Sequence, residues 1–368
     1  MKKKPRKKLG PIDFVLFSTI MLLVAIGVVM VYSASSYSSF YSTGDSMQYL
    51  KKQALWAGVG AVCMLFTMKI DYHIYKKYII PLMGITIVLL CVVLVCPPVN
   101  GARRWIPLGF ASIQPSEIAK YMVVIYMAKS LEIKGENVKT FSRGVLPYLL
   151  VSGFFAGMVL LEKNLSIASV IMFVTMIMLF VAGSKLRHLF VICGGVGAAG
   201  VAAIALESYR LKRFTSFLDP WKDPKGDSYQ LIQSLLALGS GGIWGAGLGK
   251  SRQKCYYIPE PHTDFIFSII GEELGLIGCS VVIILFVIFI WRGIVTASKA
   301  KDTFGTLLAT GITSIIAIQA IINIAVVTGS MPVTGVPLPF ISYGGSSLVI
   351  NLSAMGILLN ISRQKKRV

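Results

Sequence analysis

The 368-residue chain is 55% hydrophobic and 14% charged, and its mean hydropathy is +0.73. This composition excludes a single soluble domain, because too few polar residues are present to cover its surface. Long continuous apolar runs predict an all-α integral membrane protein, and the lack of alternation within them argues against a transmembrane barrel. The formal charge of +20 would suggest nucleic acid for a soluble protein, but here we expect the bases to flank membrane spans and expect no nucleic-acid partner.

The apolar runs predict about ten transmembrane helices with both termini in the cytoplasm. We expect residues 1–11 to form a basic tail, residues 12–362 a single membrane domain and residues 363–368 a second basic tail. The first apolar run is longer than the roughly 7–15 residues of a signal-peptide core, so it is predicted to be an uncleaved span. The predicted spans are 12–32, 53–69, 79–97, 117–131, 145–161, 165–183, 189–206, 265–291, 303–329 and 346–361.

The positions of the basic residues support this topology. Most of the 36 Lys and Arg residues lie in the termini or in segments expected inside the cell, and few lie in the short outer loops. The large extracytoplasmic loop, at about residues 207–262, is rich in bases, but long loops are largely exempt from this rule. Its bases either form a solvated face near anionic headgroups or bind an anionic substrate.

The six cysteines form no CxxC pair, and the three histidines lie far apart in the sequence. This spacing favours buried structural thiols over a disulfide framework or a metal cluster.

Two arginines, Arg103 and Arg104, precede the fourth predicted span. Glu117 and Lys120 follow, and their spacing places them on one face of a helix, where they can pair. The pair either fixes helix packing or belongs to a site near the same membrane boundary as Asp264. In the second case, acidic and basic groups converge on one outward-facing cavity.

Asp264 lies where the long polar loop meets the eighth predicted span. An ionisable group at membrane depth is costly, so Asp264 is a candidate functional residue. An Asp at the start of a helix also caps backbone N–H groups and suits the helix dipole. Sequence position alone leaves both interpretations open.

The last outer loop, residues 330–345, contains several prolines and adjacent glycines that exclude a regular helix. Irregular backbone at membrane depth requires burial in protein or a wet cavity. Together with Gln319 and Asn323 on the preceding span, this loop is predicted to form a wall of a polar chamber. For these two side chains, polar contacts between helices are the alternative.

These stretches together resemble the SEDS family of membrane proteins, the group of FtsW, RodA and SpoVE. The resemblance covers nearly the whole chain and is closest to the FtsW/SpoVE branch. The chain departs from the family at Asn164, where an Asp is frequent, and at Tyr256, where some relatives have a Glu. The blocks that carry the resemblance are Gly101-Ala102-Arg103-Arg104-Trp105 with Gln114-Pro115-Ser116-Glu117, Asp219-Pro220-Trp221, Tyr229-Gln230, Pro259-Glu260-Pro261-His262-Thr263-Asp264-Phe265, and Pro339-Phe340-Ile341-Ser342-Tyr343-Gly344-Gly345-Ser346-Ser347.

The resemblance implies a peptidoglycan glycosyltransferase of the bacterial cytoplasmic membrane. Such an enzyme polymerises lipid II at the outer face by an inverting transfer to the growing glycan strand, and the matching general base is Asp264. Relatives act in cell division, cell shape and sporulation, and the implied protein partner is a class B penicillin-binding protein that contacts the long loop. Membrane lipids surround the spans.

We also assign expected roles to residues around Asp264. Arg103, Lys120 and Arg210 are candidates for binding the lipid pyrophosphate, with Glu117 holding Lys120 in place. A divalent cation, Mg²⁺ or Mn²⁺, is a candidate helper, although no ligand cluster in the sequence specifies one. The candidate loop-shaping residues are Glu260, His262, Thr263, Ser342 and Tyr343, and His262 is alternatively a proton relay.

Two other classes of function fit a ten-span protein with a polar interior. One is a lipid II flippase, and the other is a non-catalytic scaffold that recruits cell-wall enzymes. Fold resemblance alone does not decide between them.

Overall fold

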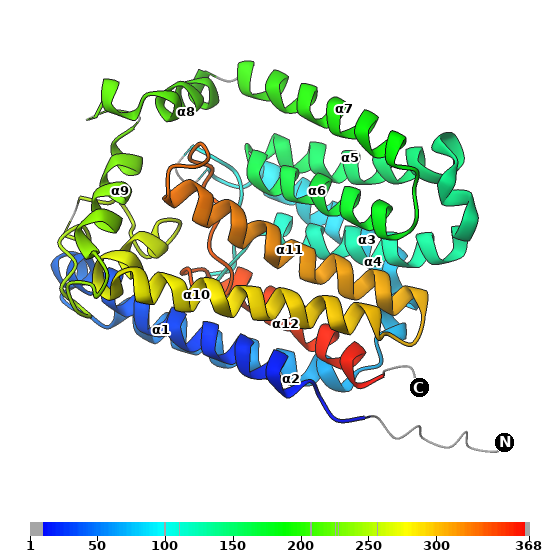
Figure 1. The fold of residues 1–368 in the computed structure, drawn as a ribbon, viewed down its shortest axis with the longest axis horizontal. Helices are drawn as coiled ribbons and strands as arrows, with labels where there is room; N and C mark the ends of the chain where they lie inside the picture. Colours follow the sequence, from blue (N-terminus) through cyan, green and yellow to red (C-terminus); the bar gives the residue numbers. More distant parts are fainter. Residues whose placement is uncertain are drawn as a thin grey trace.

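The computed structural model describes residues 10–98, 101–109, 111–206, 208–224, 226, 228–255 and 257–364. This part of the chain contains twelve α-helices and one short antiparallel hairpin (Figure 1). The bounds are α1 Phe14–Thr43, α2 Gln48–Lys69, α3 His73–Val95, β1 Ile106–Pro107, β2 Ser112–Ile113, α4 Pro115–Lys134, the short turns η1 Gly135–Lys139 and η2 Phe141–Val145, α5 Leu146–Leu161, α6 Leu165–Val181, α7 Leu186–Ala205, α8 Ser208–Leu218, η3 Pro220–Lys222, α9 Tyr229–Gly241, α10 Ile266–Ser298, α11 Thr303–Val327 and α12 Gly345–Arg363.

Each of the ten predicted spans corresponds to a helix within the described ranges, and the all-α membrane fold is confirmed. Six stretches, which contain α1, α3, α5, α10, α11 and α12, are long and apolar enough to cross a membrane, and α6 and α7 are shorter apolar helices. The described chain begins at Gly10 and ends at Gln364 at the same end of the bundle, which we call the N/C end. The long loop with α8 and α9 lies at the opposite end, the loop end (Figure 1).

The first helix is longer than predicted. It continues past the expected end at residue 32 to Thr43, through a serine-rich segment. The hydroxyl of Ser35 donates to the carbonyl of Val31 at 2.7 Å, and that of Thr43 donates to Ser39 at 2.9 Å. Because the helix backbone accepts these hydroxyl hydrogen bonds, the fall in hydropathy does not end the helix.

Close contact between α2 and α12 forms one wall of the bundle. Gly356 on α12 faces α2 so closely that a Cβ atom there would lie 2.3 Å from the carbonyl oxygen of Met64. The hydroxyl of Thr67 on α2 donates to the carbonyl of Ser353 on α12 at 2.9 Å. Small residues and interhelical hydrogen bonds hold helices together where lipid offers no hydrophobic drive.

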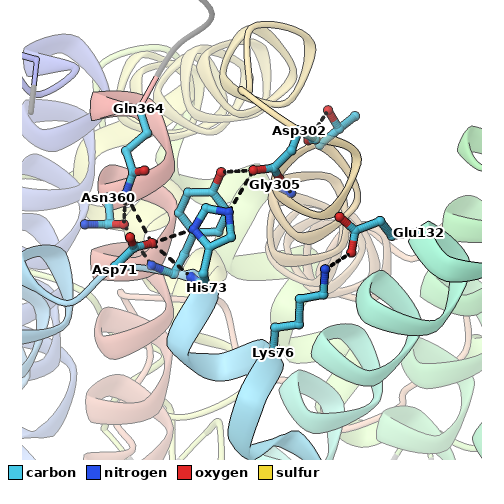
Figure 2. Close-up of polar contacts among 10 residues, drawn as sticks. Asp71, His73, Lys76, Glu132, Asp302, Gly305, Asn360 and Gln364 are labelled. Atoms are coloured by element: carbon cyan, nitrogen blue, oxygen red, sulfur yellow. Dashed lines mark hydrogen bonds and ion pairs between the residues drawn. The ribbon is translucent and has the colours of Figure 1, made fainter. Parts of the chain in front are cut away.

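At the N/C end, polar side chains from three helix ends contact one another (Figure 2). The His73 ring lies between two carboxylates, with Nδ1 at 2.6 Å from Asp71 and Nε2 at 2.8 Å from Asp302. Asp302 also caps α11 by accepting from the Gly305 N–H at 2.7 Å, and it accepts from the Tyr72 hydroxyl at 2.8 Å. These contacts fix the starts of α3 and α11 relative to each other.

The long helix α10 is broken near the loop end. Gly275 has φ 65° and ψ −163°, so the helix continues beyond it only after a sharp kink. Gly271, before the kink, packs against α9, where a Cβ atom on it would lie 2.4 Å from the Leu238 side chain, and α10 also contacts α1 and α11. Figure 1 shows α7 along the edge of the bundle opposite α1. The kink therefore places the beginning of α10, directly after Asp264, inside the loop end.

Candidate active site

Side chains from two other segments, α11 and the loop before α12, donate hydrogen bonds to the backbone of the stretch that carries Asp264. The Asn323 side-chain amide on α11 donates to the carbonyl of Asp264 at 2.7 Å, and also to the carbonyl of Val336 at 2.7 Å. The Ser342 hydroxyl donates to the carbonyl of Thr263 at 2.7 Å. These bonds fix the main chain on which the Asp264 side chain is carried.

The carboxylate of Asp264 is half-buried and lines two cavities. The N-cap residue of α10 is Phe265, so Asp264 precedes the capping position that the sequence left open for it. Gly335 packs beside the carboxylate, and a Cβ atom at this glycine would lie 3.2 Å from Asp264 Oδ2. The small residue leaves room for the acid at the cavity wall.

The first cavity, which we call the inner cavity, has a volume of about 240 Å³ and reaches from Asp264 down to α4 and α12. Its deep wall includes Glu117, whose carboxylate pairs with Lys120 at 3.0 Å and accepts from the Ser347 hydroxyl at 2.9 Å. Both members of the ion pair are 1% exposed. A buried pair needs such extra hydrogen bonds to offset desolvation. Glu117 meets the cavity, and Lys120 lies behind it.

Arg103, Lys120 and Arg210 were predicted to bind the pyrophosphate, but they do not all lie at the inner cavity. Arg103 is exposed and donates to the carbonyl of Leu94 at 2.7 Å, away from the walls of the inner cavity. Its neighbour Arg104 lines this cavity and donates to the carbonyl of Lys163 at 2.6 Å. The side chain of Arg210, like Tyr256, lies outside the described part of the chain.

Two further cavities are lined by the turn that precedes α10. The side cavity, about 260 Å³, lies between Gln230 on α9 and Asp264. The outer groove, about 1060 Å³, runs from the loop along α2, where Lys52, Leu55 and Val59 line it. Glu260 and Thr263 line all three spaces. The turn at residues 260–264 is therefore where three approaches meet.

His262 is a buried part of an aromatic cluster. Its ring lies 4.4 Å from the Tyr49 ring and 5.4 Å from the Tyr343 ring, measured between centroids. Burial lowers the pKa of His262 to about 4, so the imidazole is neutral near pH 7. The Tyr343 N–H donates to the carbonyl of His262 at 2.9 Å. These contacts fit the predicted loop-shaping role better than the alternative proton relay.

Some residues at the site were not singled out as binding residues by the sequence. Asn164 caps α6 through its side chain and lines the inner cavity, although it had been noted as a family departure. Glu162 is 0% exposed beside it, and burial raises the pKa of this carboxyl to about 8, with Ser116 and Arg104 lowering it in part. The sequence pattern did not mark either residue as part of a site, because both lie in the three-residue connection between α5 and α6, where polar residues are common.

The comparisons with known proteins agree along the whole chain. The family model described as cell cycle protein, which groups FtsW, RodA and SpoVE, matches residues 13–367. Stage V sporulation protein E of Bacillus subtilis is 46% identical over 367 residues, covering 98% of this chain and 99% of that protein. A probable peptidoglycan glycosyltransferase FtsW of a Geobacter species is 43% identical over 359 residues, covering 96% of this chain and 97% of that protein.

Two solved structures share the fold. The rod shape determining protein RodA of Thermus thermophilus has a TM-score of 0.70 and 27% identity, covering 97% of this chain and 98% of that chain. A chain of a peptidoglycan synthase complex, described as coordinating polymerization and crosslinking, has a TM-score of 0.79 and 28% identity, covering 97% of this chain and 99% of that chain. By sequence and by fold, the chain belongs to the FtsW/RodA/SpoVE family.

Proposed function

We propose that this protein is a peptidoglycan glycosyltransferase that polymerises lipid II, with Asp264 as the general base. Relatives named as probable peptidoglycan glycosyltransferases support the reaction class. The observation that carries the assignment of the base is the place of Asp264, whose side chain lines both the inner and the side cavity. Two sugars can approach such a group from different sides.

The chemistry follows from one displacement. The acceptor hydroxyl gives its proton to the Asp264 carboxylate as its oxygen attacks the anomeric carbon of the donor. The new C–O bond forms while the bond to the lipid diphosphate breaks, and the diphosphate leaves with the electron pair. One displacement inverts the anomeric centre and requires no covalent enzyme intermediate.

Cations are needed where the negative charge of the diphosphate develops. Arg104 on the inner cavity and Lys52 on the outer groove are the best-placed bases among the described residues. The apolar groove wall formed by Leu55 and Val59 suits the lipid chain attached to that diphosphate. Arg103, Lys120 and Arg210 remain predicted contributors.

A divalent cation, Mg²⁺ or Mn²⁺, fits the oxygen donors at this site. The described residues contain no cluster of three His, Cys, Asp or Glu residues that could hold a metal. Asp264 and Glu260 both line the inner cavity, and Mg²⁺ is commonly held by one or two carboxylates together with substrate phosphates. When bound, the ion would neutralise charge on the departing diphosphate.

The loop end is proposed to face the outside of the bacterial cytoplasmic membrane, with the N/C end in the cytoplasm. The excess of basic residues in the tails and in the segments at the N/C end supports this orientation. The membrane domain, residues 12–362, then lies between two cytoplasmic tails.

The proposed protein partner is a class B penicillin-binding protein bound at the long loop. The chain's likeness to a member of a peptidoglycan synthase complex supports such an assembly. Trp221 is 62% exposed in this loop, and exposed aromatic side chains often anchor interfaces. We expect Trp221→Ser to weaken co-purification of the partner at least about tenfold. Trp244→Ser, at a more exposed position in the same loop (81%), serves as the control; equal binding by the wild type and both variants would contradict this contact.

The direct test is polymerisation of lipid II by purified protein with its partner. Asp264→Asn is expected to reduce the rate at least about a hundredfold, because the amide cannot accept the proton. The variant should keep the wild-type unfolding temperature. Undiminished glycan synthesis by Asp264→Asn would remove this residue from the mechanism, and lipid transport across sealed vesicles without polymer would favour a flippase.

A further inference from the structure

A pair of adjacent glutamates on α10 binds the loop that precedes Asp264. Glu272 is 3% exposed, and its carboxylate accepts from the Arg252 N–H at 2.8 Å, from the Gln253 N–H at 3.3 Å and from the Ser251 hydroxyl. One buried carboxylate thus takes three donors from three consecutive residues. Hydrogen bonds to a charged group are the stronger kind, so this carboxylate fixes the loop firmly.

The neighbouring Glu273 is 0% exposed and forms a buried ion pair with Lys254 at 2.9 Å. Its carboxylate also accepts from the Ser251 N–H at 3.3 Å and from the Ser33 hydroxyl of α1 at 2.5 Å. Lys254 in turn donates to the Gly249 carbonyl at 2.7 Å. Each charged group therefore has several partners, which a buried pair requires to be stable.

The backbone repeats this connection at the kink of α10. The N–H groups of Ala246 and Gly247 donate to the carbonyls of Glu272 and Glu273 at 2.9 and 3.0 Å. A Cβ atom on Gly275 would lie 2.4 Å from the backbone nitrogen of Gly245, so this close approach requires glycine. Side chains and main chain together join the loop to the first turns of α10.

Asp264 lies between the two joined segments. The contacts connect residues 251–254 to residues 272–273, and the chain between them forms a closed loop that contains the proposed base. A closed loop has fewer accessible conformations than one held at a single end. Glu272, Glu273 and Lys254 are absent from the walls of the three cavities described above, so they do not meet a substrate there.

We propose that Glu272, Glu273 and Lys254 form a clamp whose function is to position Asp264, which makes them positioning residues for glycosyl transfer. The catalytic part of this inference rests on the proposed role of Asp264. The structural part, that these three residues hold the segment around residue 264 in place, does not depend on the role of Asp264.

The position of residue 264 can be measured without any enzymatic assay. Asp264→Cys is labelled with a membrane-impermeant maleimide, and labelling of protein that retains Asp264 is subtracted to remove the native cysteines. In the Glu273→Gln background, we expect the labelling rate to rise at least about threefold, because a released segment opens more often. Glu136→Gln is the matched control, since it breaks an exposed ion pair with Lys139 on another loop.

A second variant guards against misfolding of the first. Lys254→Met combined with Glu273→Gln removes both charges, so it leaves no unpaired ion and should fold. We expect the same rise in labelling from this double variant. An unchanged labelling rate in both folded variants would overturn the clamp.

Polymerisation with Asp264 in place tests the catalytic part. We expect either clamp variant to lower kcat at least about tenfold while KM changes less than about twofold, because a displaced base affects the chemical step rather than binding. Faster labelling with unchanged kcat would show that the clamp holds the segment but does not serve catalysis. If Asp264→Asn itself stays active, the proposed role of Asp264 as the base fails, and the clamp is then judged by labelling alone.

Discussion

The two ends of the bundle use polar side chains in different ways. At the N/C end, His73, Tyr72 and Asp302 contact one another directly, side chain to side chain. At the loop end, Asn323 and Ser342 instead donate to backbone carbonyls in the stretch that carries Asp264. The first arrangement joins side chains to one another, whereas the second holds the main chain beside an acid that lines two cavities.

This contrast indicates that the N/C end contributes to stability and the loop end to chemistry. Catalytic groups work best when surrounding residues hold them in a fixed position. We therefore expect loss of activity when the residues that hold the Asp264 stretch are substituted, and loss of stability without loss of activity when Asp302 is substituted.

The largest effect is expected from Asn323→Leu at the loop end. The amide of Asn323, 1% exposed, supplies hydrogen bonds to the carbonyls of Asp264 and Val336, and its loss leaves both without this donor. Displacement of a catalytic group by about 1 Å can cost on the order of a hundredfold in rate. We expect kcat for lipid II polymerisation to fall by about that factor.

Thr310→Val on the same helix is the control, because its hydroxyl bonds within α11 to Thr306 at 2.9 Å. Wild-type kcat in a folded Asn323→Leu protein would contradict the idea that the main chain sets the position of the acid.

A pH-dependent effect is expected from Glu162, also at the loop end. Its pKa is raised from 4.5 to about 8, chiefly by burial, so between these values the folded protein binds a proton that the unfolded chain has lost. Stability should therefore fall as the pH rises from about 4.5 to about 8, and the loss is on the order of a few kcal/mol. Glu162→Gln removes this fall.

The measurement is the unfolding temperature in detergent at pH 5 and pH 8.5. The difference between the two temperatures should shrink in Glu162→Gln and persist in Glu136→Gln, whose carboxylate is exposed. The same difference in all three proteins would mean that Glu162 is already ionised at pH 5.

The positions of the helices could be predicted from the sequence, because long apolar runs have few alternatives in a membrane. The end of α1 could not, since the hydroxyl of Ser35 bonds within the helix and hides its polarity. Asp264 was a candidate from the family blocks and from its boundary position, and the structure places it at the walls of two cavities. The choice of Arg104 over Arg103 at the cavity depends on the β1–β2 hairpin between α3 and α4, for which periodicity gave no signal.

The contacts of the clamp were also beyond prediction. Glu272 and Glu273 lie within a predicted span, where acidic residues call for partners, but the sequence does not say which. Their partners lie about twenty residues earlier, and the glycine-rich chain between α9 and residue 251 can adopt many shapes. Only the folded loop brings Lys254 to Glu273.

The smallest effect is expected from Asp302→Ala at the N/C end. Burial raises the pKa of Asp302, but hydrogen bonds from the Gly305 N–H, Tyr72 and His73 outweigh it and lower the pKa overall. The stabilisation is therefore present above the ordinary Asp pKa of about 4 and is lost as the pH falls through the lower, folded-state value. Near pH 7, loss of the helix cap and its partners should cost about 1–2 kcal/mol.

The unfolding temperature should fall accordingly, while kcat and KM for polymerisation stay within about twofold of wild type, since no cavity wall changes. Asp45→Ala provides a control, because its pair with Lys51 is exposed and such pairs contribute little. A large loss of kcat in Asp302→Ala, with Asp45→Ala unchanged, would mean that the N/C end is coupled to the site at the opposite end of the bundle. The separation of stability from chemistry between the two ends would then be wrong.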